Sequence, residues 1–431
     1  MPTRRVRRAG AGLVALALAA ATLAGCIGEP EEPYTPSGTA AVEGEAVLDP
    51  WFEAVRGDAD DAADVVVLGD SVSEGSGLRD HLERRWVDRL QAQLRERSGT
   101  PDCPTTPGGW QGTTSLVPAY YQASSLPDPQ VRGMTTLTPD LGPGGRGMAL
   151  EPGASITWKV RAESVDIGYR TRFGGGPFEV RIDGEIPYDG LAVPTDADGG
   201  AERRTWSSGD LGPGTHTITV RNDVKGSTAR RAVITDLMPY RGDRDRCVHV
   251  LDASRSGVSA RTISQTPGYL RDSLSLEPDL LLVPLGFNDR RTGSSARDFG
   301  ESLDSVISQA REYGYDGPIL LVGWFTPAPV RGQASWTGYL RVMQGLTRRE
   351  GVSFIDLSPV LPAADPSSRY FRDGLHPSEQ GQPLIADVLT EVLVPPGDGT
   401  PTTSGSATPS STSGTSSADP AQRPEESSGT P

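Results

Sequence analysis

The stretch that most constrains the fold of this chain is residues 65–71, with the sequence VVVLGDS. Its first four residues are apolar and three of them are β-branched, which predicts a buried strand that ends at Gly69. A helical pattern begins at Leu78, so Ser71 lies on a strand-to-helix turn, where open α/β folds bind ligands. An Asp-Ser pair also caps helices. This stretch alone therefore leaves both a chemical and a purely structural role open for Ser71.

The same alternation of strands and helices returns in the second half of the chain. Buried strands are predicted at 247–251, 280–285, 319–324 and 352–357, and helices at 296–313, 336–350 and 378–393. With the opening strand, this makes five strands that alternate with helices. Such a pattern predicts a parallel sheet covered on both faces.

Three further motifs follow predicted strands or precede the last helix. Gly257 lies in SRSGVS (254–259), Asn288 in GFND (286–289) and His376 in DGLHP (373–377). Together with the Gly-Asp-Ser of residues 69–71, and in this order, they resemble the four blocks of the GDSL or SGNH hydrolase superfamily. The resemblance covers residues 63–85 and 247–393. It implies a flavodoxin-like, three-layer α/β/α fold with a five-stranded parallel sheet.

The resemblance also implies a role for each matching residue. Ser71 is the expected nucleophile, His376 its general base, and Asp373 the carboxylate that orients the imidazole. The expected oxyanion hole consists of the backbone N–H groups of Ser71 and Gly257 and the side-chain amide of Asn288. The block around Gly257 is the loosest match. No metal ion and no cofactor is implied, and Asp70 and Asp289 are expected to fix turns.

Between these motifs, residues 151–240 change to a period of two, as in the segments 155–160, 178–182 and 215–220. With the hairpin signal Asp183-Gly184, this predicts an antiparallel β-sandwich. The hydrolase domain is then discontinuous, with residues 63–150 and 241–395 on either side of the insertion. The insertion resembles the jelly-roll modules of some carbohydrate esterases, and binding of carbohydrate is one interpretation of it.

Two pairs of side chains in this region have alternative interpretations. Tyr188 and Trp206 form either a sugar platform or part of the buried core, and the core is favoured for both. Asp196 and Asp198 lie in a loop that indicates calcium binding or, more simply, a turn. The glycine-rich residues 142–147 lack the strand and the helix that a nucleotide site needs.

The first 26 residues have the features of an export signal. Four arginines precede the apolar run 11–23, and the residues Leu23-Ala24-Gly25-Cys26 resemble a bacterial lipobox. The resemblance implies cleavage before Cys26, acylation of its thiol, and anchoring to the outer face of the cytoplasmic membrane. An ordinary signal peptide with an incidental cysteine is the alternative, and it also implies export.

Two segments are predicted to lie outside the folded part. Residues 27–62 are rich in Pro, Gly, Glu and Asp, and they are expected to form a flexible tether. Residues 396–431 consist largely of Pro, Gly, Ser and Thr and are expected to be disordered, because they have little apolar surface to bury.

The remaining two cysteines and the net charge add further constraints. The helix predicted over 78–97 returns the chain to the amino-terminal edge of the sheet shortly before Cys103. Cys247 opens a strand that, in a flavodoxin-like order, is the neighbour of strand 65–68, so a Cys103–Cys247 disulfide is predicted. A net charge of −15 argues against nucleic acid as a partner.

These observations predict an exported serine esterase that hydrolyses O-acyl esters, with short acyl chains such as acetyl on carbohydrate as the expected substrate. A lipase, a lysophospholipase and an acyltransferase of the same fold are the alternative enzymes. A carbohydrate-binding surface lipoprotein with a non-catalytic hydrolase scaffold is the alternative of a different class.

Overall fold

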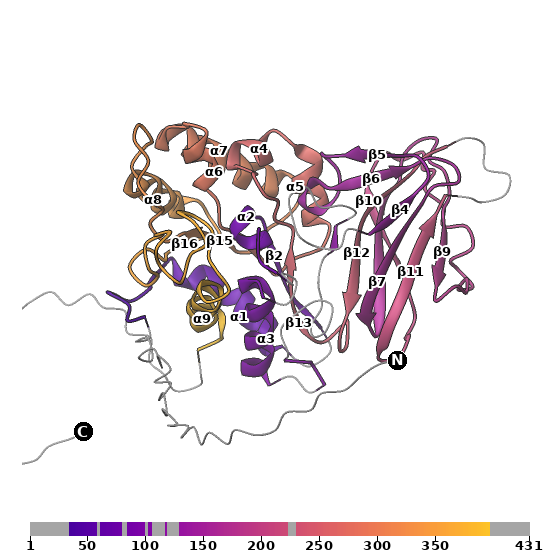
Figure 1. Cartoon of the computed structure of the whole chain (residues 1–431), viewed down its shortest axis with the longest axis horizontal. Coiled ribbons are helices and arrows are strands. Elements are labelled where there is room, and N and C mark those ends of the chain that lie inside the picture. The colour runs from indigo at the N-terminus through magenta and orange to yellow at the C-terminus, as the bar shows by residue number, and fades with distance from the viewer. Residues whose placement is uncertain are drawn as a thin grey trace, which may run out of the picture.

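The computed structural model of the chain describes residues 34–57, 61–79, 84–99, 102–105, 117–118, 129–222 and 230–396. It has two parts that pack against each other, an α/β hydrolase part and a β-rich module beside it (Figure 1).

The predicted parallel sheet is present in the hydrolase part. Its strands are β2 (Ala63–Val67), β13 (Val248–Asp252), β14 (Leu280–Val283), β15 (Ile319–Gly323) and β16 (Val352–Asp356). They are all parallel in the order β13-β2-β14-β15-β16, which confirms the flavodoxin-like arrangement. A short strand, β1 (Val42–Glu43), adds an antiparallel edge to β16. The sequences of these strands are nearly continuous apolar runs, because helices bury both faces of the sheet.

Helices cover the two faces of this sheet (Figure 1). One face carries α1 (Asp49–Arg56), α3 (Trp86–Ser98) and α9 (Gly381–Leu393), with α3 packed on α9. The helices that follow the other strands are α4 (Ala260–Ser264), α5 (Pro267–Leu274), α6 (Phe287–Arg291), α7 (Ala296–Glu312) and α8 (Trp336–Gly345). Of these, α7 contacts α4, α5 and α8. This is the three-layer arrangement that the sequence predicts.

The first predicted helix begins later than expected. The pattern predicted a helix over Leu78–Arg97, but the short helix α2 (Ser71–Glu74) comes first and α3 begins only at Trp86. Gly75 and Gly77 have φ angles of 75° and 80°, which end α2. A side chain at Gly77 would collide with Arg372.

The prediction of a flexible tether over residues 27–62 is wrong for the segment that forms β1 and α1. Trp51 is fully buried, and its indole N–H donates to the carbonyl of Leu393 at the end of α9 (2.9 Å). Phe52 is also buried in the hydrolase core. The segment is acidic overall, but it contains an amphipathic helix, and the apolar side chains of this helix are buried only when the domain folds.

The β-rich module begins earlier than predicted. Its two antiparallel sheets have the orders β10-β8-β12-β6-β5 and β4-β7-β11-β9, and β3 pairs with β12. Its strands are β3 (Val117–Pro118), β4 (Gln130–Arg132), β5 (Thr135–Thr138), β6 (Gly147–Leu150), β7 (Ser155–Ala162), β8 (Ser164–Arg170), β9 (Glu179–Ile182), β10 (Arg203–Ser207), β11 (Gly214–Arg221) and β12 (Ala232–Tyr240). The predicted start at 151 therefore misses the strands before it, because those strands are short and separated by glycine and proline.

The module has its own apolar core between the two sheets. Trp206 is buried in this core, as favoured, whereas Tyr188 is fully exposed, so the core interpretation is wrong for Tyr188. The predicted hairpin turn is present, with positive φ at Asp183 and Gly184. Asp196 accepts hydrogen bonds from the Gly174 N–H and the Arg230 guanidinium, as a loop-fixing residue does.

The predicted disulfide joins Cys103 and Cys247, which are 144 residues apart in sequence. Cys26 with the rest of the signal segment and most of the predicted tail lie outside the described residues. Within the part of the chain that the structure describes, no helix has the length and apolarity to cross a membrane.

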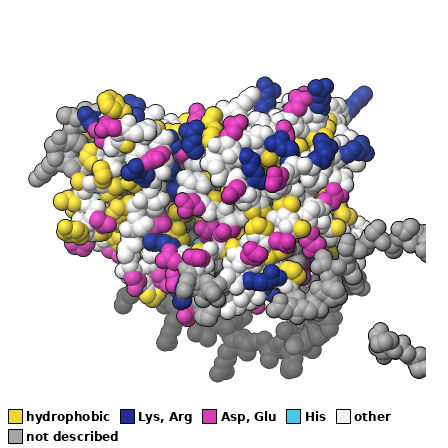
Figure 2. Space-filling view, turned by 180° about the vertical axis from the view of Figure 1, so that it is seen from behind, with side chains coloured by type: hydrophobic (Ala, Val, Ile, Leu, Met, Phe, Trp, Pro, Cys, Tyr) yellow, Lys and Arg dark blue, Asp and Glu magenta, His cyan; other side chains and the backbone are white. Residues whose placement is uncertain are grey.

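Charges of both signs are interspersed on the face shown in Figure 2. Such a mixture of charges is typical of a solvated protein surface. Among the described residues, the exposed large hydrophobic side chains belong to the module, with the exception of Val330: they are Val131, Met134, Leu137, Phe173, Tyr188 and Leu191.

Candidate active site

The predicted site residues come together at the carboxyl-terminal edge of the parallel sheet. Ser71 opens α2 directly after β2, Gly257 lies in the turn after β13, and Asn288 is in α6 after β14. Asp373 and His376 come from the loop before α9. The carboxyl ends of parallel strands meet at one edge, so residues that are far apart in sequence converge there.

The turn around Ser71 is fixed by its neighbours. Asp70 caps α2, and its carboxylate accepts the N–H of Val72 (2.9 Å). Gly69 has no room for a side chain, because an added Cβ would lie 2.3 Å from Ser73 Oγ and 2.7 Å from Ser254 Oγ. Ser71 is thus held with its hydroxyl at the sheet edge, and it is largely buried.

A chain of hydrogen bonds links Ser71, His376 and Asp373. Ser71 Oγ lies 3.0 Å from His376 Nε2, and His376 Nδ1 lies 2.8 Å from Asp373 Oδ2. The carboxylate facing Nδ1 places the ring proton there, which leaves Nε2 as the acceptor for the Ser71 hydroxyl. The other oxygen of Asp373 accepts the backbone N–H groups of Leu375 and His376 at 2.7 Å each.

These hydrogen bonds determine the charge of Asp373. Burial by itself would raise the pKa of this carboxyl, but the hydrogen bonds from the backbone and imidazole of His376 and from Leu375 lower it below its usual value. Asp373 is therefore a carboxylate at neutral pH, and it favours a positive charge on the neighbouring imidazole.

Gly257 and Asn288 follow β13 and β14, the two strands that flank β2 in the sheet. Gly257 has a φ of 82° and an exposed backbone, in a turn closed by a hydrogen bond from Val258 N–H to Arg255 O (3.1 Å). Asn288 Nδ2 donates to Val258 O at 2.9 Å and lies 3.4 Å from Asp70 Oδ2. The shorter bond ties the amide of Asn288 to the turn that contains Gly257.

Asp70 and Asp289 both fix turns, as expected. Asp289 accepts the backbone N–H of Ala260 at the start of α4 (3.0 Å). The pKa of Asp70 is raised to about 7: burial is the main cause, the N–H of Val72 opposes the shift, and the nearby Asp289 carboxylate adds to it. Burial also raises the pKa of Asp289.

The sequence interpretation missed two residues beside this site. Glu74 is the last residue of α2, and Arg146 comes from the module, yet their side chains form a buried ion pair. The only sequence signal near these two residues is the glycine-rich stretch 142–147, which contains Arg146 and does not fit a nucleotide site. The other described histidines are elsewhere: His249 is buried at the start of β13, and His216 pairs with Asp183 in the module.

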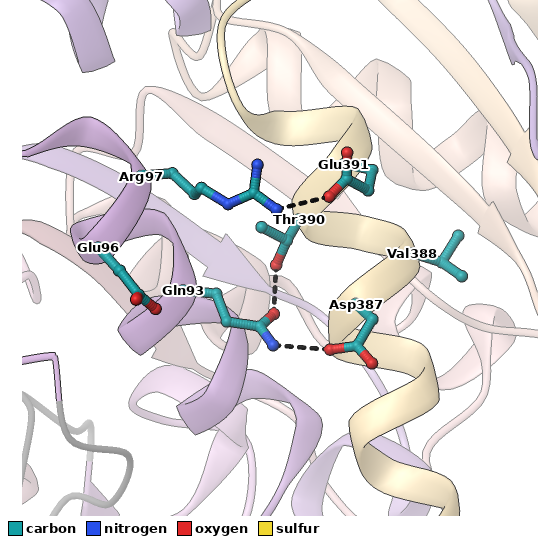
Figure 3. A pocket seen from close by; sticks show the side chains of 7 residues that line it. All are labelled: Gln93, Glu96, Arg97, Asp387, Val388, Thr390 and Glu391. Atoms are coloured by element: carbon teal, nitrogen blue, oxygen red, sulfur yellow. Dashed lines mark hydrogen bonds and ion pairs between the residues drawn. The ribbon is translucent and has the colours of Figure 1, made fainter. Parts of the chain in front are cut away.

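A groove of about 510 Å³ lies between α3 and α9, and the site residues do not line it (Figure 3). Gln93 donates to Asp387 (2.7 Å) and accepts from Thr390 (2.5 Å), and Arg97 pairs with Glu391 (2.8 Å). Apart from Glu96, the polar side chains that line this groove therefore bond to one another.

Residues 223–384 match the model of the GDSL-like Lipase/Acylhydrolase family. The chain carries a GDSL-like acylhydrolase domain. The matched residues include Gly257, Asn288, Asp373 and His376, while Ser71 precedes the matched range because the module separates it from the other blocks. The domain is that of a carboxylic ester hydrolase. No curated protein matches the chain in sequence.

The chain is similar to several solved structures. A peptidoglycan O-acetylesterase has 16% sequence identity and a TM-score of 0.58, over 83% of this chain and 98% of the other. Family two carbohydrate esterases from Cellvibrio japonicus and Clostridium thermocellum, the latter with cellohexaose, each have 14% identity and a TM-score of 0.28. They cover 65% and 60% of this chain and 98% and 97% of theirs. With an identity of 16% and a TM-score of 0.58, the similarity to the peptidoglycan O-acetylesterase shows a shared fold.

Proposed function

We propose that this protein is an exported serine esterase that removes short O-acyl groups, such as acetyl, from carbohydrate. The observation that carries the proposal is the hydrogen-bonded chain from Asp373 through His376 to Ser71, with Gly257 and Asn288 after the two strands that flank β2. These are a nucleophile, a base, an orienting carboxylate and two donors at one edge of the sheet.

In the first half of the reaction, Ser71 Oγ attacks the ester carbonyl while His376 Nε2 takes its proton. The carbonyl oxygen becomes negatively charged, and it accepts hydrogen bonds from the N–H groups of Ser71 and Gly257 and from Asn288 Nδ2. His376 then gives the proton to the leaving sugar oxygen, and the acyl group stays on Ser71.

In the second half, water attacks the acyl-enzyme while His376 again takes a proton. The acid leaves, and Ser71 Oγ recovers its proton. Asp373 keeps its negative charge throughout, stabilises the imidazolium and does not itself take the proton.

Two observations support carbohydrate as the alcohol part of the substrate. The solved peptidoglycan O-acetylesterase shares the fold over most of this chain, including the module. Tyr188 is a fully exposed aromatic side chain on the module, of the kind on which a sugar ring stacks. The predicted signal segment ending at Cys26 supports the proposal of export and of a lipid anchor, which would give the enzyme access to cell-wall and environmental glycans.

The test is hydrolysis of p-nitrophenyl acetate, butyrate and octanoate by the full chain in detergent, beside its Ser71→Ala variant. We expect turnover of acetate that is lost in the variant, and release of acetate from O-acetylated peptidoglycan or xylan. A preference for octanoate would favour a lipase instead. Equal rates for both proteins would contradict an esterase and favour the glycan-binding alternative.

A further inference from the structure

One loop of the module lies against the active site. It is the segment of residues 139–146 between β5 and β6, here called the module arm. The arm contains a 3₁₀ turn (Pro143–Gly145) that contacts α5, and the N–H of Gly142 donates to Asp272 on that helix (2.7 Å). Residues 142–146 are buried, so the arm is part of the interior.

The arm and the turn that holds Gly257 are joined by two arginines. The turn is defined here as residues 254–258, the Gly257 turn. Arg255 of the turn donates to the carbonyls of Pro139 and Gly145 in the arm, at 2.9 and 3.1 Å. In the opposite direction, Arg146 of the arm donates to the carbonyl of Ser254 at 2.5 Å.

Arg146 also reaches the helix that carries the nucleophile. It forms an ion pair with Glu74, three residues after Ser71 in α2, and both side chains are 2% exposed. The second oxygen of Glu74 accepts the backbone N–H of Ser256 (2.6 Å) and the Ser256 hydroxyl. Glu74 thus connects the turn of Ser71 to the residue directly before Gly257.

The connection depends on the charge of Arg146. A buried carboxylate is strongly unfavourable without a cation, and removing one partner of a buried ion pair leaves the other charge uncompensated. Without Arg146, the Glu74 carboxylate loses its cation, and a turn of its side chain toward water relieves the uncompensated charge. Its hydrogen bonds to Ser256 then weaken, and the peptide that leads into Gly257 loses its anchor.

We propose that Arg146 is a positioning residue for the oxyanion hole and that the module, through Arg146, is part of the catalytic apparatus. The inference rests on the proposed function, since it concerns the Gly257 N–H as an oxyanion donor. Arg146 does not touch substrate; it acts through Glu74 and Ser254 on the geometry of the turn.

The test compares Arg146→Gln with Arg170→Gln in the full chain. Arg170 is a control for the loss of a buried ion pair between the module and the hydrolase part: its partner Asp272 also accepts the Gly142 N–H of the arm, but the hydrogen bonds and ion pairs of Arg170 and Asp272 among the described residues do not include the Gly257 turn. We expect Arg146→Gln to lower kcat for p-nitrophenyl acetate about 10- to 100-fold with little change in KM, as for partial loss of an oxyanion donor. Arg170→Gln should keep kcat.

A second measurement does not depend on activity. Hydrogen exchange of the peptide that spans residues 253–259 should become faster in Arg146→Gln and stay slow in Arg170→Gln. Equal kcat values in the two variants, or unchanged exchange in Arg146→Gln, would overturn the inference. If the parent chain and its Ser71→Ala variant are equally inactive, the proposed function fails, and the exchange measurement alone decides whether Arg146 holds the turn.

Discussion

At the scale of single residues, the active site depends on how His376 is held. Its two ring nitrogens face a hydroxyl on one side and a carboxylate on the other, at 3.0 and 2.8 Å. Asp373 is in turn held by two backbone N–H groups of its own loop, so the loop itself orients the imidazole. The side chain of Asp373 is 53% exposed, so solvent screens part of its charge, and its main effect is on the tautomer and the orientation of the ring.

Replacement of Asp373 by Asn tests this role. We expect kcat to fall about 10²- to 10⁴-fold with little change in KM, because the amide no longer favours the proton on Nδ1. Steady-state kinetics with p-nitrophenyl acetate measures the effect. Asp365→Asn is the control, because Asp365 is an exposed aspartate of the same loop that bonds only locally, to Ser367. Equal kcat values for the two variants would contradict the role of Asp373.

At the scale of elements, the two ends of the strands have different roles. The carboxyl ends of β2, β13 and β14 lead into the active site, whereas the amino end of β2 contains buried groups that affect the stability of the fold. At the amino end of β2, Asp64 donates its backbone N–H to Asp279 (2.8 Å). The fully buried α1 residue Trp51 lies against the end of α9.

The α1 segment is expected to be part of the folded domain. Trp51→Ala should reduce the free energy of unfolding by about 3–5 kcal/mol, because it leaves a large cavity and an unpaired carbonyl at Leu393. Urea denaturation measures this loss. Glu53→Ala, at an exposed position of the same helix, should change stability by less than about 0.5 kcal/mol. A Trp51→Ala variant as stable as Glu53→Ala would show that α1 does not pack on the domain.

Asp64 makes stability depend on pH. The pKa of the Asp64 carboxyl is raised to about 8, mainly by burial and in addition by the nearby Asp279 carboxylate, while Arg95 opposes the increase. Between pH 4 and 8 the folded state therefore binds more protons than the unfolded state, so stability falls as pH rises. Each pH unit in this window removes up to about 1.4 kcal/mol.

Asp64→Asn should remove this dependence. Relative to the parent, the variant should gain stability steadily from pH 5 to pH 8, as measured by denaturant unfolding at each pH. Asp316→Asn, at an exposed position, should follow the parent throughout. A constant difference between Asp64→Asn and the parent across this range would contradict the raised pKa.

At the scale of the whole molecule, the two parts are joined by buried charges and a covalent bond. Arg170 with Asp272 and Arg146 with Glu74 cross from the module to the hydrolase part. The disulfide spans the complete insertion, since Cys103 precedes the module and Cys247 follows it. The module is thus joined to the hydrolase part by the disulfide that closes the insertion and by the two buried ion pairs.

Removal of the disulfide tests the covalent part of this junction. A Cys103→Ala/Cys247→Ala variant should lose up to about 5 kcal/mol, because the closed loop of 144 residues strongly restricts the unfolded chain. Denaturant unfolding of this variant should match that of the parent protein in reductant. An oxidised parent no more stable than the double variant would contradict the prediction.

The sequence alone determined the places of Ser71, Gly257 and Asn288, because each follows a strand and the carboxyl ends of parallel strands share an edge. His376 was predicted from its motif before the last helix, and its hydrogen bond with Ser71 agrees with that prediction. The disulfide followed from the same strand order. These features depend on the local pattern of strands and motifs, together with the rule that the carboxyl ends of parallel strands meet at one edge of the sheet.

Only the tertiary structure decided the packing of α1, the late start of α3, the early start of the module and the exposure of Tyr188. It also decided the contact of Arg146 with Glu74, which are 72 residues apart. An arginine in a glycine-rich loop is ordinary in sequence, since the burial that makes its charge important is created only when the module and the hydrolase part pack together.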